Sequence, residues 1–592
     1  GRVVRSPLDL LRLSSADHNS TLRPLVFATM DIRSSLQSLA GTLPRKRMRQ
    51  QGQRFLAATA DCRSTQQRLL RELLELNGSS LFGREYGLDR VSDPAEFRRA
   101  IGVTDYEFYR PWIEQLKAGN QSAMLGPDNP LLMFTLSSGT TAESKFIPVS
   151  QRFLDDYRRG WTTWAIFAYD DHHAATGGNI IQFVSHHEQF HTSAGTPCGN
   201  ISGLAVRMQS KFVVRHMYSI PFDVARIEDP EAKYYASMRS AVSDGRVGMV
   251  TTANPSTLLH VARFANTHRQ SLIRDIADGT LNADFDIPSD IRTNLASRLK
   301  PLRKRARELD RIVERTGQLL PKDYWPAMQF LAVWTGGSCA AYFDAVRECY
   351  GNLPTRDHGL HATEGRMTIP LQDNSCDGVL DVVSNYFEFI PADDYGSTQP
   401  TVLQAHELEA DNDYYILLTT ASGLYRYDIC DVVRCSGFCG TTPLLRFLHK
   451  GEHIASITGE KISESQVVDS VRHAFRTLKL GIDQFTAMPI WGEPPGYRLV
   501  VEEPEQGDSD TWNRLAEHVD RRLQELNIEY HEKRQSGRLA PLELTRIPRG
   551  SWSRFAEIRC RKRGGSIEQN KHPCLIPDLE TSKAFFRDYV VG

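Results

Sequence analysis

The sequence predicts an α/β protein with a large N-terminal part and a small α+β part at its C-terminus. Its 592 residues are enough for several domain-sized cores, and short apolar runs alternate with helical patterns from Pro130 onward. A polar, glycine-containing stretch at 450–463 is typical of a hinge between domains. We therefore expect an N-terminal domain over 31–449 and a mobile C-terminal domain over 450–592, with residues 1–30 an extension of undecided status.

The spacing of the apolar residues predicts the individual elements. Strand-like runs occupy 131–136, 179–184, 247–251, 386–391, 414–420 and 497–502. Helical spacing occupies 34–43, 49–76, 151–167, 256–278, 291–315, 465–478 and 511–526. This order predicts sheets that are covered by helices, followed by a β-rich subdomain at 378–438.

The composition excludes several classes of protein. Charged residues make up 24% of the chain, and the formal net charge of -1 provides no global field that would attract nucleic acid or anionic lipid. No apolar run approaches the roughly 20 residues that span a bilayer. The 10 cysteines are scattered, which favours a reducing, cytoplasmic compartment over a disulfide scaffold. We expect a monomer that acts on small molecules.

A hydroxyl- and glycine-rich turn follows the apolar strand at 131–136. Its sequence is Ser137-Ser138-Gly139-Thr140-Thr141-Ala142-Glu143-Ser144-Lys145. Backbone N–H groups and hydroxyls in such a turn can hold phosphate oxygens, Gly139 permits a close approach, and Lys145 can bring positive charge to the β- and γ-phosphates. The spacing of a Walker loop is absent. The alternative is a surface turn rich in small polar residues.

Further polar segments follow this turn along the chain. They are Trp334-Thr335-Gly336-Gly337-Ser338, Gly359-Leu360-His361-Ala362-Thr363-Glu364-Gly365, Ser422-Gly423-Leu424-Tyr425-Arg426-Tyr427-Asp428-Ile429-Cys430-Asp431-Val432-Val433, Leu445-Arg446-Phe447-Leu448-His449-Lys450, Gly459-Glu460-Lys461-Ile462-Ser463-Glu464 and Gly564-Gly565-Ser566-Ile567-Glu568-Gln569-Asn570-Lys571-His572-Pro573. Together with the turn at Ser137, this ordered set resembles the adenylate-forming enzymes. It is most similar to the auxin-responsive acyl-acid-amido synthetases, the plant Gretchen Hagen family and its bacterial relatives.

The resemblance implies a large adenylate-forming domain, a small C-terminal lid, and ATP and Mg²⁺ as cofactors. A small carboxylic acid would be activated as an acyl-adenylate and then attacked by an amine, which we expect to be an amino acid. Coenzyme A as the acceptor is one alternative, and a non-catalytic nucleotide-binding protein is another. The simultaneous presence of Lys145, Glu364, Asp431 and Lys571 argues against the second alternative.

The resemblance also implies a role for each matched residue. Ser137, Ser138, Gly139, Thr140, Thr141 and Lys145 would bind the phosphates, while Gly336, Gly337 and Ser338 would lie near the adenine. Leu360 occupies the position where such enzymes commonly stack an aromatic ring on the base. Thr363 would contact the α-phosphate and Glu364 would hold Mg²⁺, which prefers hard oxygen ligands.

The remaining implied roles concern ribose, the hinge and catalysis. Asp431 would accept hydrogen bonds from both ribose hydroxyls, because an ionised carboxylate is an acceptor only. Cys430 replaces the usual glycine, and Asp428 is the competing candidate, unless it is a strand-end acid paired with Arg426. Lys450 would bind nucleotide at the start of the hinge. Lys571 would be the catalytic lysine that stabilises charge as pyrophosphate leaves.

Three patterns compete with this interpretation. His187–His191 matches H-E-x-x-H, but it stands between a strand and a turn-rich stretch, whereas zinc binding requires one helical face. Cys430, Cys435 and Cys439 include no C-x-x-C pair and are expected to be small buried hydrophobes. The basic runs at 45–49 and 559–563 are expected to be solvated surface rather than nucleic-acid sites.

Overall fold

The computed structural model describes residues 42–137, 145–183, 186, 188–201, 203, 216–336, 339, 342–451, 454–480, 482, 484–503, 509–552, 554 and 573–587. Its architecture is mixed α/β, as predicted. The chain folds into two compact units. The first comprises 1–136, 146–336 and 344–448, and the second comprises 137–145, 337–343 and 449–592. Each unit has its own hydrophobic core.

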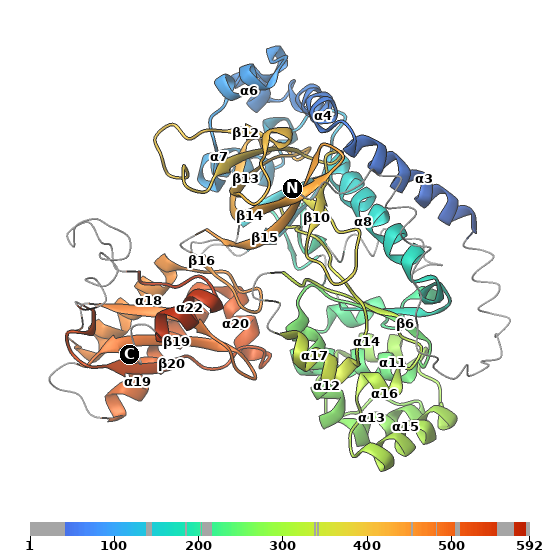
Figure 1. Cartoon of the computed structure of the whole chain (residues 1–592). Helices are drawn as coiled ribbons and strands as arrows, with labels where there is room; N and C mark the ends of the chain where they lie inside the picture. The colour runs from blue at the N-terminus through green and yellow to red at the C-terminus, as the bar shows by residue number, and fades with distance from the viewer. Residues whose placement is uncertain are drawn as a thin grey trace. The chain divides into compact units, whose positions relative to one another are not determined.

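Helices open the described part of the first unit. They are α3 (Thr42–Thr59), α4 (Cys62–Asn77), α5 (Leu81–Glu85), α6 (Pro94–Ala100) and α7 (Tyr106–Lys117). The single helix predicted over 49–76 is wrong, because the chain breaks at Ala60 and Asp61. The Asp61 side chain caps α4 by accepting the N–H of Ser64 at 3.1 Å. Helix α3 runs alongside α8 (Gln151–Asp171) (Figure 1).

Two four-stranded sheets follow. The first has the order β2-β1-β5-β4, and its strands are β1 (Leu131–Ser137), β2 (Lys145–Ser150), β4 (Phe190–His191) and β5 (Pro197–Gly199). The second is parallel with the order β3-β6-β7-β8, and its strands are β3 (Asn179–Gln182), β6 (Val247–Thr251), β7 (Phe330–Ala332) and β8 (Thr355–Arg356). Strand β6 is buried throughout and has the predicted bounds.

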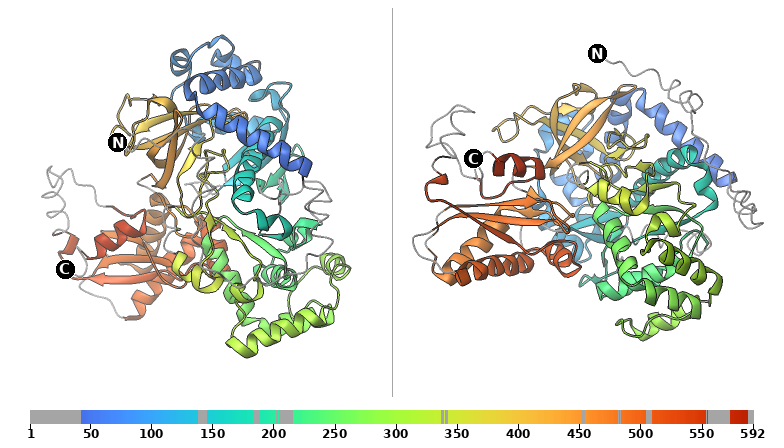
Figure 2. Two further views of the ribbon diagram at one scale, coloured as in Figure 1. Left: turned by 45° about the vertical axis from the view of Figure 1, so that its right-hand side comes forward. Right: turned by 60° about the horizontal axis from the view of Figure 1, so that its bottom comes forward.

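Among the described residues, the connections between neighbouring strands of the parallel sheet all contain helices (Figure 2). They contain α11 (Pro230–Ser243), α12 (Pro255–Thr267), α13 (Arg269–Asp278), α14 (Ser289–Ala296), α15 (Arg303–Thr316), α16 (Pro321–Tyr324) and α17 (Phe343–Tyr350). The helices predicted over 256–278 and 291–315 are each two helices. The first is divided at His268, and the second is interrupted over 297–302, where Pro301 cannot continue a helix.

A seven-stranded sheet forms the β-rich subdomain. Its order is β12-β11-β13-β14-β15-β10-β9, with strands β9 (Thr368–Ile369), β10 (Gly378–Leu380), β11 (Tyr386–Pro391), β12 (Leu403–Gln404), β13 (Asp413–Thr419), β14 (Tyr427–Cys439) and β15 (Thr442–Lys450). The pairings of β11 with β13 and of β13 with β14 are antiparallel. Side chains of β11, β13 and β14 share the largest core with α4, α7 and β1.

The second unit contains a small α+β fold, also as predicted. Its sheet has the order β18-β19-β20, with strands β18 (Phe485–Ile490), β19 (Gly496–Glu502) and β20 (Glu543–Ile547). The helices are α18 (Glu464–Leu478), α19 (Ser509–Leu526), α20 (Ile528–Gln535) and α22 (Leu579–Phe586), and β16 (Ile454–Ala455) pairs with β17 (Ile462–Ser463). Alternate sheet residues pack against α18 and α19, and the others pack toward α22.

None of the helices that the structure describes combines the length and the apolar character of a bilayer-spanning segment.

Candidate active site

The predicted phosphate-binding turn lies between two neighbouring strands of one sheet. Ser137 ends β1, and Lys145, which is half-buried, begins β2. The positions between them, including Ser138, Gly139, Thr140 and Thr141, lie outside the described residues, as do Gly337, Ser338 and Lys571.

Thr363 and Glu364 lie at the tip of a tight hairpin that follows β8. The N–H of Ala362 donates to the carbonyl of Gly365 at 2.9 Å, and the N–H of Gly365 donates back to Ala362 at 3.3 Å. The Thr363 hydroxyl donates to the Glu364 carboxylate at 2.6 Å. Only 9% of Glu364 is exposed. The tip therefore presents two adjacent oxygen groups of the kind that Mg²⁺ and its phosphate ligands use.

Asp357 joins this hairpin to the segment that begins at Trp334. Its carboxylate accepts the N–H and the hydroxyl of Thr335 at 2.5 and 2.7 Å, and also the N–H of Gly359 at 2.6 Å. The indole N–H of Trp334 donates to the Gly359 carbonyl at 2.9 Å. Burial raises the pKa of Asp357 to about 6 despite these bonds. Two predicted motifs are thus held together by an acid that the sequence analysis did not single out.

Gly336 and Leu360 lie in these two segments. A Cβ atom on Gly336 would come within 3.2 Å of the Cys376 side chain, so the backbone there is closely packed. The N–H of Leu360 donates to the Thr368 hydroxyl at 2.8 Å, and its side chain packs, partly buried, against the main core.

A buried aromatic and cationic cluster supports the hairpin from α8. The Arg366 guanidinium lies 4.4 Å from the Trp161 ring centroid and donates to the His358 carbonyl at 2.5 Å. The Trp161 ring also contacts the imidazoles of His358 and His361, with centroids 5.1 and 5.5 Å apart. Burial lowers the pKa of His361 to about 3, and the positive charge of Arg366 adds to the shift. Burial likewise lowers the pKa of His358 well below its usual value.

The predicted ribose-binding residue, Asp431, lies in a bulge of β14. Leu417 of β13 pairs with Asp428, whereas Tyr415 pairs with Val432, so β14 contains extra residues between these pairs. Within the bulge Cys430 has φ of 58°, a left-handed conformation that favours glycine. Asp431 is 2% exposed. The left-handed conformation of Cys430 explains why glycine is usual at this position.

Asp428 has a different partner from the one considered in the sequence analysis. Its carboxylate accepts the N–H of Cys430 at 2.7 Å and the hydroxyl of Tyr395 at 2.8 Å. Arg426 pairs instead with Glu388, at 2.8 Å. The interpretation of Asp428 as an acid paired with Arg426 is therefore wrong. Asp428 instead supports the bulge through its bond to Cys430.

Tyr427 links the bulge to the hairpin. It pairs with Leu418 of β13. Burial raises the pKa of Tyr427 well above its usual value, and the negative charge of Glu364 adds to the shift. Gly365 lies against the neighbouring strand, because a Cβ atom there would be 3.1 Å from the Leu418 side chain. The first unit thus contains the segments at 334–336, 357–366 and 427–431, joined by these contacts. Lys145 and Lys450, which ends β15, belong to the second unit.

The competing patterns have structural explanations. Phe190 and His191 form β4, so the described part of the H-E-x-x-H string is not helical, as predicted. Among the described residues, no group of three or more His, Cys, Asp or Glu is arranged to hold a metal. Cys435 and Cys439 are buried, as predicted, whereas Cys430 is half-buried. The basic run at 45–49 belongs to α3, and its Arg49 pairs with Asp170 at 2.8 Å.

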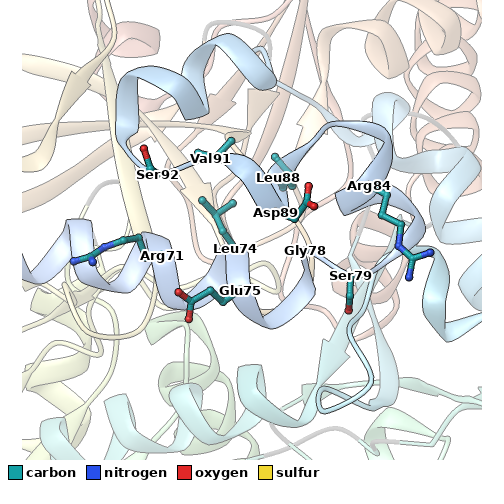
Figure 3. A pocket seen from close by; sticks show the side chains of 10 residues that line it. All are labelled: Arg71, Leu74, Glu75, Gly78, Ser79, Arg84, Leu88, Asp89, Val91 and Ser92. Atoms are coloured by element: carbon teal, nitrogen blue, oxygen red, sulfur yellow. The ribbon is translucent and has the colours of Figure 1, made fainter.

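A cavity of 580 Å³ opens elsewhere in the first unit, near the end of α4 (Figure 3). Its lining residues are Arg71, Leu74, Glu75, Gly78, Ser79, Arg84, Leu88, Asp89, Val91 and Ser92. This lining includes none of the described residues that were predicted to bind nucleotide.

Comparison with known proteins assigns the chain to a family. Models of the GH3 family match three consecutive parts of the chain: the N-terminal domain at 51–355, the central domain at 378–450 and the C-terminal domain at 465–580. The jasmonoyl--L-amino acid synthetase JAR6 of Nicotiana attenuata is 25% identical over 88% of this chain and 93% of its own. The indole-3-acetic acid-amido synthetase GH3.8 of Oryza sativa subsp. indica is 25% identical over 88% and 89%.

The fold has a counterpart among solved structures. The GH3.15 acyl acid amido synthetase superposes with a TM-score of 0.60 at 21% identity, covering 90% of this chain and 95% of that one. The family models match well over half of the 592 residues. The chain therefore belongs to the GH3 family and is an ATP-dependent ligase of the acyl-acid-amido synthetase type.

Proposed function

We propose that this chain joins a small carboxylic acid to an amino acid in two steps. In the first step a carboxylate oxygen attacks the α-phosphorus of ATP, forming the acyl-adenylate and releasing pyrophosphate. In the second step the amine attacks the acyl carbon, the bond to AMP breaks, and the nitrogen loses a proton. The names of the relatives support this class of substrates, since JAR6 and GH3.8 are named for a jasmonoyl and an indole-3-acetic acid conjugate. These two relatives are equally identical to this chain but are named for different acids. Their names therefore support a class of carboxylic acids and not a single acid.

One observation carries the proposed site: Gly365, next to Glu364 in the hairpin, lies against Leu418 of β13, and Leu418 pairs with Tyr427 in the strand that contains the Asp431 bulge. We assign Asp431 to the ribose hydroxyls, because a carboxylate offers acceptors to a vicinal diol. We assign the Thr363 hydroxyl to the α-phosphate. Leu360 and the backbone at Gly336 would cover the adenine. The Glu364 carboxylate and the backbone at Leu360 are already oriented by hydrogen bonds, so these two groups would need little reorganisation.

Mg²⁺ is part of the proposal, and the donor set fits it. Glu364 is a hard oxygen ligand whose orientation is fixed by the Thr363 hydroxyl at 2.6 Å. When bound, the ion would neutralise charge on the phosphates. The chain's own cations would act beside it. Lys145 would face the β- and γ-phosphates, Lys450 would bind nucleotide at the start of the hinge, and Lys571 would stabilise the charge that develops as pyrophosphate leaves.

The test is exchange of labelled pyrophosphate into ATP across a panel of carboxylic acids. Exchange requires only the first step, so an amine need not be present. We expect exchange that depends on the acid. In Glu364→Gln the exchange rate should fall by at least about a hundredfold, because Mg²⁺ would lose its charged ligand. Glu348→Gln is the matched control, since Glu348 is an exposed acid of α17. If no acid drives exchange, and Lys571→Ala and Glu364→Gln behave like the wild type, the proposed function is wrong.

The acceptor is tested separately, with an acid that drives exchange. Product masses are measured after amino acids or coenzyme A are added. We expect the mass of an amide formed with loss of water between acid and amino acid. A thioester product, with no amide from any amino acid, would instead assign the second step to coenzyme A.

A further inference from the structure

We propose that Glu388, which Arg98 also holds in place, is a positioning residue for the nucleotide, acting through Arg426 on the segment that leads into Asp431. The inference rests on the proposed function, in which Asp431 binds the ribose. Glu388 lies outside the motifs that carry the family resemblance, in the middle of β11. Its side chain does not face the ligand in this proposal and would affect it only through Arg426.

Glu388 is a buried carboxylate with two arginine partners. It is 1% exposed, and each of its oxygens faces a different guanidinium. Arg98 of α6 donates to Oε1 at 2.7 Å, and Arg426 donates to Oε2 at 2.8 Å. Burying a charge is costly unless it is paired and hydrogen-bonded, so this arrangement is stable only when all three groups are in place. The arginines come from positions 328 residues apart, which makes Glu388 a junction between α6 and the strand that follows Arg426.

Arg426 is held in an unusual backbone conformation. Its φ of 50° is left-handed, and a residue other than glycine needs compensating contacts there. Its N–H donates to the Thr419 hydroxyl at 2.9 Å, and its Nη1 donates to the Ile101 carbonyl at 2.8 Å. Together with the bond to Glu388, these contacts hold both the backbone and the side chain. These contacts at Arg426 therefore fix the direction in which the chain enters β14.

The chain around Arg426 is also held from the opposite side by Thr104. The Thr104 hydroxyl donates to the Tyr425 carbonyl at 2.7 Å, and its N–H donates to the Arg426 carbonyl at 3.0 Å. The N–H of Asp428 in turn donates to the Thr104 carbonyl at 2.9 Å. Residues 425–428 therefore run beside Thr104 as a short parallel bridge. A shift at Arg426 would pass directly to Asp428, whose carboxylate supports the bulge that contains Asp431.

The consequence is a specific effect on ribose recognition. Replacing Glu388 by Gln keeps the volume but removes the charge that both arginines share. The Arg426 turn then loses its strongest support, and Asp431 no longer meets the ribose hydroxyls in a fixed position. Discrimination between ATP and 2′-deoxy-ATP measures that contact, because the two nucleotides differ by one ribose hydroxyl. A general loss of folded protein would lower both activities equally and leave their ratio unchanged.

The experiment measures kcat/KM for ATP and for 2′-deoxy-ATP in acid-dependent pyrophosphate exchange. We expect Asp431→Asn to lower the ratio of the two by about tenfold, equivalent to one hydrogen bond to a charged group. Glu388→Gln should lower the same ratio by a similar factor, with kcat at saturating ATP within about twofold of the wild type. The double variant should lose no more than Asp431→Asn alone, because both changes remove one contact.

A milder pair of variants covers the case in which Glu388→Gln does not fold. Arg98 is 28% exposed, so Arg98→Gln frees one carboxylate oxygen without leaving a deeply buried cation, and Arg98→Lys should restore the ratio in part. Asp275→Asn is the matched control. Asp275 is a buried acid of α13 that accepts the Tyr235 hydroxyl at 2.7 Å, and its loss should lower stability without changing the ratio.

The outcomes separate the two claims. If Asp431→Asn lowers the ratio while Glu388→Gln and Arg98→Gln keep the wild-type value, the positioning role is wrong and the proposed site is unaffected. If Asp431→Asn itself leaves the ratio unchanged, the assignment of the ribose fails, and the positioning role fails with it. If Asp275→Asn lowers the ratio as much as Glu388→Gln does, the effect is not specific to Glu388, and the inference is likewise overturned.

Discussion

The carboxylate of Asp428 accepts the backbone N–H of Cys430, two residues further along, at 2.7 Å. This local bond stabilises the left-handed conformation of Cys430, whose φ is 58°. The next residue is Asp431, the proposed ribose ligand. A bond between near neighbours in β14 therefore supports the bulge. Asp428, the competing candidate for the ribose ligand, has this supporting role.

Replacing Cys430 by glycine should stabilise the protein. A residue with a Cβ atom in the left-handed region costs roughly 1–2 kcal/mol, part of which is offset by the greater entropy of glycine in the unfolded chain. We expect a net gain of about 0.5–1 kcal/mol, measured as a higher midpoint of chemical denaturation. Cys435→Gly is the control, because Cys435 is a buried residue of the same strand without positive φ, and that variant should be less stable. A lower denaturation midpoint for Cys430→Gly would show that the left-handed backbone at Cys430 is not strained.

Replacing Gly160 by alanine should destabilise the protein. A Cβ atom there would lie 2.5 Å from the Cδ atom of Arg366, whose guanidinium is held against the Trp161 ring and the His358 carbonyl. Overpacking of this kind costs about 1–3 kcal/mol, which exceeds the gain in helix propensity of about 1 kcal/mol. Gly177→Ala is the matched control, because nothing lies within 4 Å of a Cβ at that position. Equal denaturation midpoints for the two variants would show that Arg366 can move aside.

The half-buried imidazole of His361 should make stability fall in acid. Its folded pKa is about 3 and the ordinary value is 6.5, so below pH 6.5 the unfolded chain binds a proton that the folded chain does not. Stability is therefore lost as the pH falls from about 6.5 toward 3, by about 2 kcal/mol between pH 7 and pH 5. His358 acts in the same direction, whereas Asp357, whose folded pKa is raised to about 6, opposes it below pH 6.

The comparison of wild type with His361→Gln isolates this effect. Glutamine has no proton to gain, so the difference in unfolding free energy between the two proteins should shrink by about 2 kcal/mol from pH 7 to pH 5. Urea denaturation at the two pH values measures it. The surrounding groups, His358, Arg366 and Trp161, are unchanged in the variant. A difference that stays constant with pH would show that His361 takes up its proton in the folded state.

Removing the Thr363 hydroxyl should affect activity less than removing the Glu364 charge. In Thr363→Val the carboxylate loses one donor at 2.6 Å but keeps its charge, so we expect about a tenfold loss of kcat/KM for ATP. Glu364→Gln should lose about a hundredfold or more, and the Mg²⁺ concentration for half-maximal rate should rise. The Mg²⁺ dependence of exchange is measured for both variants. Equal losses would mean that Glu364 does not hold the metal.

Much of the fold could be predicted because buried strands and amphipathic helices have clear periods. The bounds of β6 and β11 follow directly from apolar runs at 247–251 and 386–391. Helix breaks were missed where a local group overrides the period. Asp61 ends one helical pattern by capping the next helix, and Pro301 lies in the interruption between α14 and α15.

The site was predictable only where it consists of local sequence. The tip at Thr363 and Glu364 is contiguous in the chain, and the replacement of glycine at Cys430 was visible in the sequence although its left-handed backbone was not. Asp357 and Glu388 could not be found in this way, because their partners are distant in sequence or lie on another element. The only signal of Glu388 is a charged residue in an otherwise apolar run, which does not identify a partner, and Asp357 lies among polar residues that give no such signal.

In the proposed reaction the acid is activated on the α-phosphorus of ATP, and an isotope label can follow the oxygen that is transferred. The reaction is run with ATP, an amino acid and a carboxylic acid labelled with ¹⁸O in its carboxylate. We expect one labelled oxygen in AMP, because the carboxylate oxygen stays on phosphorus when the amine displaces AMP from the acyl carbon. Label in inorganic phosphate with ADP as the other product, or amide formed with unlabelled AMP, would contradict the proposed reaction.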